Sequence, residues 1–153
     1  MLDIGKRAPE FKLEDQDGQQ HTLKSLLAKG PLILYFYPAD FTPGCTKEAC
    51  TFRDLQKDLV QARLRVVGVS PQDADSHQRF AAKHKLNFPL LADPDKKTVK
   101  AYDLDGPLGI GVRRGTYLIG TDGIIKDAVL ADFQISKHEA FVERAIKFGA
   151  QQK

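Results

Sequence analysis

An uninterrupted apolar run over residues 32–37, Leu-Ile-Leu-Tyr-Phe-Tyr, constrains the fold more than any other feature of this sequence. The run is short and stops at Pro38, which is typical of a strand buried on both of its faces. Segment 64–69 has a similar character and predicts a second buried strand. Strands of this kind belong to sheets covered by helices, so an α/β protein is expected.

The sequence predicts a helix between these two strands. Thr42 is a suitable capping residue, and Pro43 fits the first helical position, where its missing N–H is no loss. Apolar residues then recur at helical spacing down to about Val60: Phe52, Leu55 and Leu59. The order strand, helix, strand implies parallel neighbouring strands joined by a right-handed crossover.

Two hairpins and another helix are expected around this unit. The first hairpin spans about residues 11–23 and turns at Asp-Gln-Asp-Gly. The second has strands over 116–119 and 124–129 on either side of Gly-Thr-Asp-Gly. The additional helix covers about residues 73–84 and continues the winding of the chain.

A final helix is expected to begin at Ser136, which forms a capping box with Glu139 three residues later. Its apolar face consists of Phe141, Ala145 and Phe148. A βαβ half joined to a ββα half is the plan of the thioredoxin fold. We therefore predict an α/β, thioredoxin-like fold, with a central mixed sheet flanked by helices and an N-terminal hairpin extension. Residues 1–153 are expected to form one domain.

Composition and charge argue against several functional classes. Hydrophobic residues make up 42% of the chain and charged residues 28%, which is typical of a folded protein rather than a disordered one. No apolar run is long enough to cross a bilayer, and the N-terminus lacks a secretory signal, so a cytoplasmic location is expected. The net charge is only +3, with lysines spread along the chain, which does not favour nucleic-acid binding.

The segment that carries chemistry lies between the first buried strand and its helix. If Thr42 caps that helix, Cys45 is the third helical residue, within the first turn, where backbone N–H groups lack helical partners. These donors and the helix dipole favour a negative charge on the sulfur, and the thiolate is the nucleophilic form of cysteine. Cys50 lies more than a turn further in, so we expect it to be less readily ionised and more buried. Cys45 is therefore predicted to attack, and Cys50 to resolve its sulfenic acid as a disulfide.

The spacing of the two cysteines makes a mechanical prediction. Residues five apart on a helix differ by about 140° in azimuth and about 7.5 Å in rise, so their Cα atoms lie roughly 8.7 Å apart. A disulfide requires Cα atoms within about 7 Å and converging Cβ atoms. We therefore expect the first turns of the helix to unwind in each cycle, beginning near Pro43 and Gly44.

The same segment resembles a known family. The string Tyr-Pro-x-x-x-Thr-Pro-Gly-Cys-Thr-x-Glu-x-Cys, over residues 37–50, is similar to the active-site segment of peroxiredoxins of the bacterioferritin comigratory protein or peroxiredoxin Q branch. The likeness extends from Gly5-x-x-Ala-Pro-x-Phe through Asp15-x-Asp-Gly to the strand that contains Tyr117. Several chemically constrained positions agree in order and spacing, which makes the match specific.

The resemblance implies roles for the residues around Cys45, which would be the peroxidatic cysteine. Thr42 would hydrogen-bond the peroxide and the thiolate, and Pro38 would shield the thiolate from water. An arginine before the strand of Tyr117 would stabilise the thiolate, which selects Arg114, with the neighbouring Arg113 as the alternative.

Glu48 also matches the family pattern, although a carboxylate beside Cys45 would oppose ionisation of the thiol. It is therefore expected to orient Arg114. The glycine-rich stretch 102–114 departs from the family, because it looks short and lacks a tryptophan. Gly115 and Gly120 also replace larger residues.

The function implied is reduction of hydrogen peroxide or organic hydroperoxides, with recycling by thioredoxin or a glutaredoxin-type dithiol. No metal and no bound cofactor is required. The intramolecular resolving cysteine favours a monomer.

Other functions remain open on the sequence alone. A cysteine taken alone is more often a small buried residue than a catalyst, and Cys50 could be a core residue while an external thiol resolves the sulfenic acid. A thiol–disulfide oxidoreductase acting on proteins is a second possibility, although such enzymes commonly use Cys-x-x-Cys. A non-catalytic chaperone or binding module is a third. The four histidines show no recognised zinc spacing: His21, His77, His84 and His138.

Overall fold

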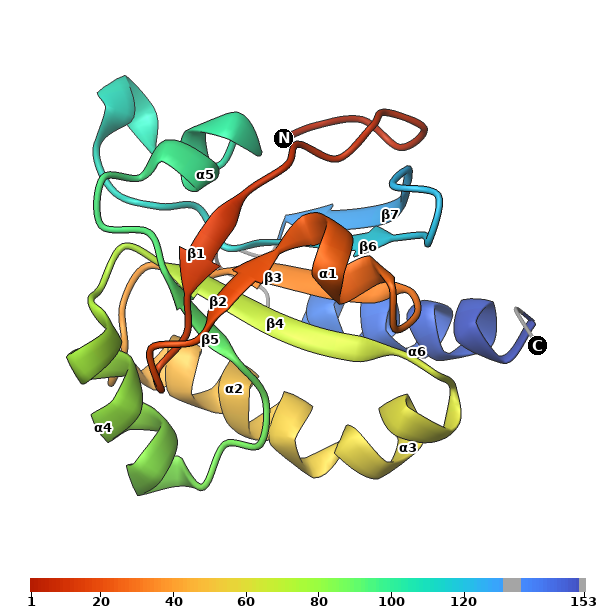
Figure 1. The fold of residues 1–153 in the computed structure, drawn as a ribbon, viewed down its shortest axis with the longest axis horizontal. Coiled ribbons are helices and arrows are strands. Elements are labelled where there is room, and N and C mark those ends of the chain that lie inside the picture. The colour runs from red at the N-terminus through yellow and green to blue at the C-terminus, as the bar shows by residue number, and fades with distance from the viewer. Residues whose placement is uncertain (131–135, 152–153) are drawn as a thin grey trace.

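A computed structural model describes residues 1–130 and 136–151 and contains one seven-stranded mixed sheet (Figure 1). The strands are β1 (Lys12–Glu14), β2 (Gln20–Thr22), β3 (Leu32–Phe36), β4 (Arg65–Ser70), β5 (Leu90–Ala92), β6 (Gly115–Ile119) and β7 (Ile125–Leu130). The helices are α1 (Leu23–Leu27), α2 (Pro43–Asp54), α3 (Gln56–Gln61), α4 (Ala74–His84), α5 (Lys97–Ala101), the 3-10 helix η1 (Pro107–Gly109) and α6 (Ser136–Gln151). The strand order across the sheet is β2-β1-β5-β4-β3-β6-β7.

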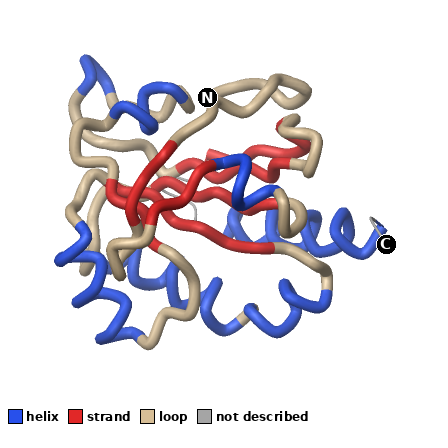
Figure 2. Tube along the Cα trace, viewed as in Figure 1, coloured by secondary structure: helices blue, strands red, loops and turns tan. Residues whose placement is uncertain are grey.

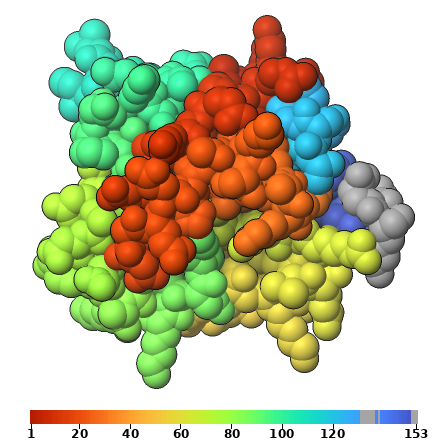
Figure 3. Space-filling model, in the orientation of Figure 1, coloured from red at the N-terminus to blue at the C-terminus, as the bar shows by residue number. Residues whose placement is uncertain are grey.

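The central strand β3 separates two hydrophobic layers, because its side chains alternate between the two faces of the sheet. Ile33 and Tyr35 belong to a core cluster with residues of α2, α3, α4 and α6. Leu32 and Leu34 belong to a second cluster with residues of α1 and α5. Helices therefore cover both faces of the sheet (Figures 1 and 2). The N-terminal hairpin and α1 occupy much of the front of the molecule in the space-filling view (Figure 3).

The predicted architecture is confirmed in its main connections. β3 and β4 are parallel neighbours joined through α2 and α3, and β4 and β5 are also parallel. β6 runs antiparallel to β3 and pairs with β7 in the predicted hairpin. β1 and β2 form the predicted N-terminal hairpin and join the sheet beside β5. In the last helix, Phe141 and Ala145 are fully buried as expected.

Several details differ from the sequence prediction. The helix expected to run to about Val60 ends at Asp54, and α3 begins at Gln56 after Leu55 leaves helical geometry. Leu23 is the first residue of α1 and not part of a strand, because the Thr22 and Ser25 side chains form a capping box there. β5 and α5 were not predicted. The expected capping box at Ser136 lies outside the described residues, since the side chain of Ser136 is not described.

Tyr35 in β3 and Tyr37, which directly follows β3, differ in their hydrogen bonding. The Tyr37 hydroxyl donates to the Asp40 carboxylate at 2.7 Å. The Tyr35 hydroxyl is buried and has no hydrogen-bond partner among the described residues. A buried polar group without a partner costs stability, whereas a buried donor matched to a carboxylate stabilises the fold.

We expect Tyr37→Phe to destabilise the fold and Tyr35→Phe not to destabilise it. Tyr35→Phe should leave the free energy of unfolding unchanged or raise it by up to about 1 kcal/mol, and Tyr37→Phe should lower it by about 1 to 3 kcal/mol. Urea unfolding of the two variants and the wild type measures both changes. Equal destabilisation by the two variants would show that the Tyr35 hydroxyl has a partner, such as a buried water.

Candidate active site

The start of α2 places Cys45 where the sequence predicts it. Thr42 is the N-cap residue, Pro43 is the first helical residue and Cys45 is the third. The first hydrogen bond of the helix runs from the Thr46 N–H to the Thr42 carbonyl at 2.8 Å. The N–H groups of Gly44 and Cys45 precede it and have no partner one turn back within the helix. The positive end of the helix is therefore directed at the Cys45 region.

The side chain of Thr42 does not cap the helix, which corrects the sequence prediction. Its backbone is extended as an N-cap residue requires, but no side-chain cap hydrogen bond is made. The hydroxyl instead donates to the carbonyl of Ala39 at 3.1 Å, within the segment that enters the helix. A hydroxyl has two lone pairs besides its proton, so in this geometry Thr42 can still accept a hydrogen bond from a ligand.

The relative burial of the two cysteines is the reverse of the prediction. Cys45 is 1% exposed and packs in the same core cluster as Tyr35, Ala49 and Phe52. Cys50 is only partly buried. A rotation of about 140° between the two positions directs Cys45 toward the sheet and turns Cys50 away from it. Both thiols are free, and α2 is continuous from Pro43 to Asp54.

Arg114 and Glu48 form a buried ion pair beside Cys45. The Arg114 Nη1 donates to Glu48 Oε1 at 3.2 Å, and Glu48 is fully buried. Arg114 also interacts with Cys45 by charge and by a side-chain hydrogen bond. Burial lowers the pKa of the guanidinium, but Glu48 and Cys45 together outweigh it and hold that pKa above its ordinary value. The structure thus places Arg114 beside the sulfur.

The buried position changes the charge state of Glu48. Burial raises the pKa of this carboxyl from 4.5 to about 7, although the charge and hydrogen bond of Arg114 act in the opposite direction. A substantial part of the Glu48 side chains is therefore protonated at neutral pH. This reduces the negative charge that Glu48 places near Cys45, and it leaves the cation of Arg114 more available to a thiolate.

A cleft of about 680 Å³ opens beside this arrangement. Its lining includes Pro38, Arg113 and Arg114 together with loop residues 105–107 and 110–112. Lys96 holds the loop in place, since its Nζ donates to the carbonyls of Gly109 and Gly111 at 2.7 and 3.1 Å. The half-buried Pro38 and the buried Arg114 thus lie together in the wall of a cavity that a small substrate could enter.

The glycine at position 115, which departs from the family pattern, is explained by packing. A Cβ atom on Gly115 would lie 2.6 Å from the Leu104 side chain. Gly115 is also the first residue of β6 and pairs with Phe36, the last residue of β3. The absence of a side chain therefore allows the strand to enter the sheet directly after Arg114.

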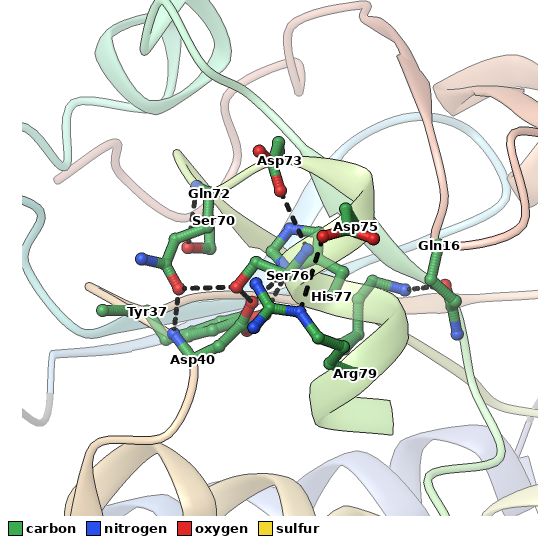
Figure 4. Close-up of polar contacts among 12 residues, drawn as sticks. Gln16, Tyr37, Asp40, Ser70, Gln72, Asp73, Asp75, Ser76, His77 and Arg79 are labelled. Carbon is green, nitrogen blue, oxygen red and sulfur yellow. Dashed lines mark hydrogen bonds and ion pairs between the residues drawn. The ribbon is translucent and has the colours of Figure 1, made fainter. Parts of the chain in front are cut away.

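Sequence reasoning missed a cluster of buried and half-buried polar side chains that contacts the segment before α2. It consists of Tyr37, Asp40, Gln72, Ser76 and His77, and we call it the Asp40 cluster (Figure 4). From the sequence alone, His77 has no assigned role beyond its place among four scattered histidines. The signal available in the sequence was its position three residues before Phe80 on an amphipathic helix, which places it on the buried face.

Comparison with known protein sequences finds matches over most of this chain. The AhpC/TSA family model matches residues 4–128. A putative chloroplastic peroxiredoxin Q of Oryza sativa subsp. indica is 42% identical over 135 residues, covering 88% of this chain and 62% of the rice protein. A putative peroxiredoxin bcp of Helicobacter pylori is 42% identical over 131 residues, covering 82% of this chain and 86% of that protein. The chain thus spans about 62% of the length of the rice relative.

Solved structures of similar proteins also match most of this chain. The crystal structure of peroxidoxin BcpB from Mycobacterium tuberculosis superposes with a TM-score of 0.89 at 35% identity, covering 96% of this chain and 97% of that one. The Xanthomonas campestris bacterioferritin comigratory protein, described for its alkyl peroxide reduction activity, gives a TM-score of 0.83 at 32% identity and covers 92% of each chain. These likenesses confirm the predicted thioredoxin-like fold class.

We expect Glu48→Gln to flatten the dependence of stability on pH. The carboxyl binds its proton more tightly in the folded chain (pKa about 7) than in the unfolded chain (about 4.5). Its contribution to stability is therefore fully present below about pH 4.5 and is lost as pH rises through about 7, by about 3 kcal/mol in all. The glutamine variant lacks this loss.

Urea unfolding at a series of pH values measures the effect. Glu143→Gln, which changes an exposed carboxyl of α6, is the matched control and should follow the wild type. Parallel pH profiles for the wild type and Glu48→Gln would contradict the assignment.

Proposed function

The chain belongs to the AhpC/TSA family and, within it, to the peroxiredoxin Q or bacterioferritin comigratory proteins, and on this premise we propose that it is a thiol peroxidase. The observation that carries the proposal is the placement of Cys45 in the first turn of α2 with the Arg114 guanidinium against it. Helix donors and a buried cation both stabilise a thiolate. The adjacent cleft provides access for a hydroperoxide.

In the first step, the Cys45 thiolate attacks the terminal oxygen of ROOH. An S–O bond forms and the O–O bond breaks, giving the sulfenic acid of Cys45 and RO⁻, which takes a proton from solvent. Arg114 stabilises the negative charge as it moves from sulfur to the leaving oxygen. Thr42 accepts a hydrogen bond from the peroxide, and Pro38 limits the access of water to the sulfur.

In the second step, Cys50 attacks the sulfur of the Cys45 sulfenic acid. An S–S bond forms, the S–O bond breaks and water leaves. Because the two cysteines lie on opposite sides of a continuous helix, the first turns of α2 unwind before the bond forms. Cys45 then leaves its core position, and the partly exposed Cys50 needs to move less.

An external dithiol of the thioredoxin or glutaredoxin type restores both thiols by disulfide exchange. Hydrogen peroxide and organic hydroperoxides are the proposed substrates, and a monomer is sufficient because both cysteines are in one chain. Among the described residues no helix is long and apolar enough to cross a membrane. The cytoplasmic location stays a prediction, since the plant relatives are named chloroplastic.

Replacement of each cysteine should stop the cycle at a different point. Cys45→Ser should abolish peroxide consumption in the presence of thioredoxin, its reductase and NADPH. Cys50→Ser should turn over once and stop as a sulfenic acid that small thiols can rescue. Activity that persists in Cys45→Ser would rule out the peroxidase. Protein disulfide exchange without peroxide consumption would favour a thiol–disulfide oxidoreductase, and inert thiols would favour a non-catalytic binding module.

Arg114→Ala should lower the second-order rate constant for peroxide by about 100-fold, because the thiolate and the leaving oxygen lose their buried cation. Single-turnover peroxide consumption in a Cys50→Ser background isolates this step. Arg113→Ala is the matched control, since Arg113 is the adjacent arginine and lines the same cleft. A larger loss in Arg113→Ala than in Arg114→Ala would show that the wrong arginine has been assigned.

A further inference from the structure

The segment between β3 and α2 is attached to α4 through Asp40. One oxygen of the Asp40 carboxylate accepts from the Tyr37 hydroxyl at 2.7 Å. The other accepts from the Ser76 hydroxyl at 2.8 Å and lies 2.7 Å from His77 Nδ1. The backbone N–H of Asp40 donates to the side-chain oxygen of Gln72 at 2.7 Å. Figure 4 shows these groups converging from the segment and from the beginning of α4.

His77 links this segment to the sheet as well. Its Nε2 lies 3.0 Å from the carbonyl oxygen of Leu91 in β5, and its Nδ1 faces Asp40. A carbonyl oxygen can only accept, so Nε2 carries a proton, and the ring orientation is fixed by a bond at each nitrogen. The side chains of Asp40 and His77 are both 0% exposed. A buried pair of this kind stays in one arrangement, because loss of either partner leaves the other unsatisfied.

The charge state of the pair is consistent with this geometry. Burial alone would raise the pKa of Asp40, but the hydrogen bond and charge of His77, with the Tyr37 and Ser76 hydroxyls, hold that pKa below its ordinary value. Asp40 is then an ionised carboxylate held by several hydrogen-bond partners. Such charge-assisted bonds are stronger than neutral ones.

Phe41, the residue after Asp40, contacts α4 as well. The Phe41 ring lies 5.2 Å from the Phe80 ring of α4, edge to face, and Lys83 Nζ lies 5.8 Å from the centre of the Phe41 ring. Phe41 has a φ of 67°, a left-handed conformation that is unfavourable for a residue with a side chain. Such a conformation persists only where surrounding contacts impose it, and it occurs immediately before Thr42.

We propose that Asp40 and His77 are positioning residues that hold the segment 38–42 in this strained conformation and so keep Thr42 and the first turn of α2 assembled around Cys45. The proposal rests on the proposed peroxidase function, whose two chemical steps need different conformations. The peroxide step needs the assembled first turn, and disulfide formation needs it unwound. Loss of the pair therefore slows the first step and does not slow the second.

The test separates the two steps in His77→Leu and Asp40→Ala. In a Cys50→Ser background, the second-order rate constant for peroxide should fall by about 10- to 100-fold, as expected when a reacting group is displaced. In the chain with both cysteines, intact-mass analysis measures disulfide against sulfinic acid at Cys45 after a fixed number of turnovers. The sulfinic fraction should fall, because the first turn unwinds more readily and the disulfide then forms before a second peroxide can oxidise the sulfenic acid.

The chain offers a matched control in a second Asp–His pair. His21 Nε2 lies 2.7 Å from Asp15 in the N-terminal hairpin, and that hairpin is separated from β3 by β5 and β4. His21→Leu removes an Asp–His pair of the same distance, made through Nε2 where His77 uses Nδ1, and should change neither readout. Asp40→Asn should stay within about threefold of the wild type, since an amide keeps an acceptor for Tyr37 and offers a donor to His77 Nδ1.

Circular dichroism establishes that each variant is folded. If His77→Leu does not fold, Ser76→Ala removes one bond to Asp40 and should move both readouts in the same directions, by a smaller factor. A uniform loss in both steps, an unchanged peroxide rate constant, or an equal effect of His21→Leu would overturn the positioning role. A wild-type chain that consumes no peroxide would instead overturn the proposed function.

Discussion

The site depends on one buried guanidinium, Arg114, placed between two acidic groups at the start of α2. It pairs with Glu48 at 3.2 Å and interacts with Cys45. The pairing of Phe36 with Gly115 in the sheet positions it, because residue 114 then lies beside the end of β3, where the chain turns toward α2. The thiol, the helix mouth and the cation are therefore brought together by the register of two strands, and not by the loop alone.

The same arrangement creates a conflict between packing and turnover. Cys45 is part of the hydrophobic core, which stabilises the assembled state, yet the proposed disulfide with Cys50 requires it to leave. The contacts around the segment 38–42 are of two kinds. Asp40 and Phe41 contact residues of α4. At the start of α2, by contrast, Pro43 is exposed and Gly44 is half-buried. We infer that movement begins on the α2 side of Thr42, with α4 as a fixed support.

The sequence was sufficient for the elements with strong patterns. The buried strand β3 is marked by a continuous apolar run that stops at Pro38, and the helix after Thr42 and the hairpin of β6 and β7 are marked by hydrophobic patterns next to clear turn or helix-start residues. The short elements β5 and α5 lack enough residues for such a pattern. The bond from the Thr42 hydroxyl to Ala39 and the partners of His77 depend on tertiary packing and cannot be read from local sequence, although the helical spacing of His77 and Phe80 does indicate that His77 is buried. The partial exposure of Cys50 depends on which face of α2 meets the sheet.

The proposed reaction depends on stabilisation of the Cys45 thiolate by the mouth of α2 and by Arg114. Ultraviolet titration of the thiolate in Cys50→Ser, with Cys45→Ser subtracted as the blank, measures this directly. We expect a thiolate signal that disappears in stoichiometric proportion when hydroperoxide is added. A sulfur that stays protonated throughout the physiological pH range and does not react with hydroperoxide would contradict it.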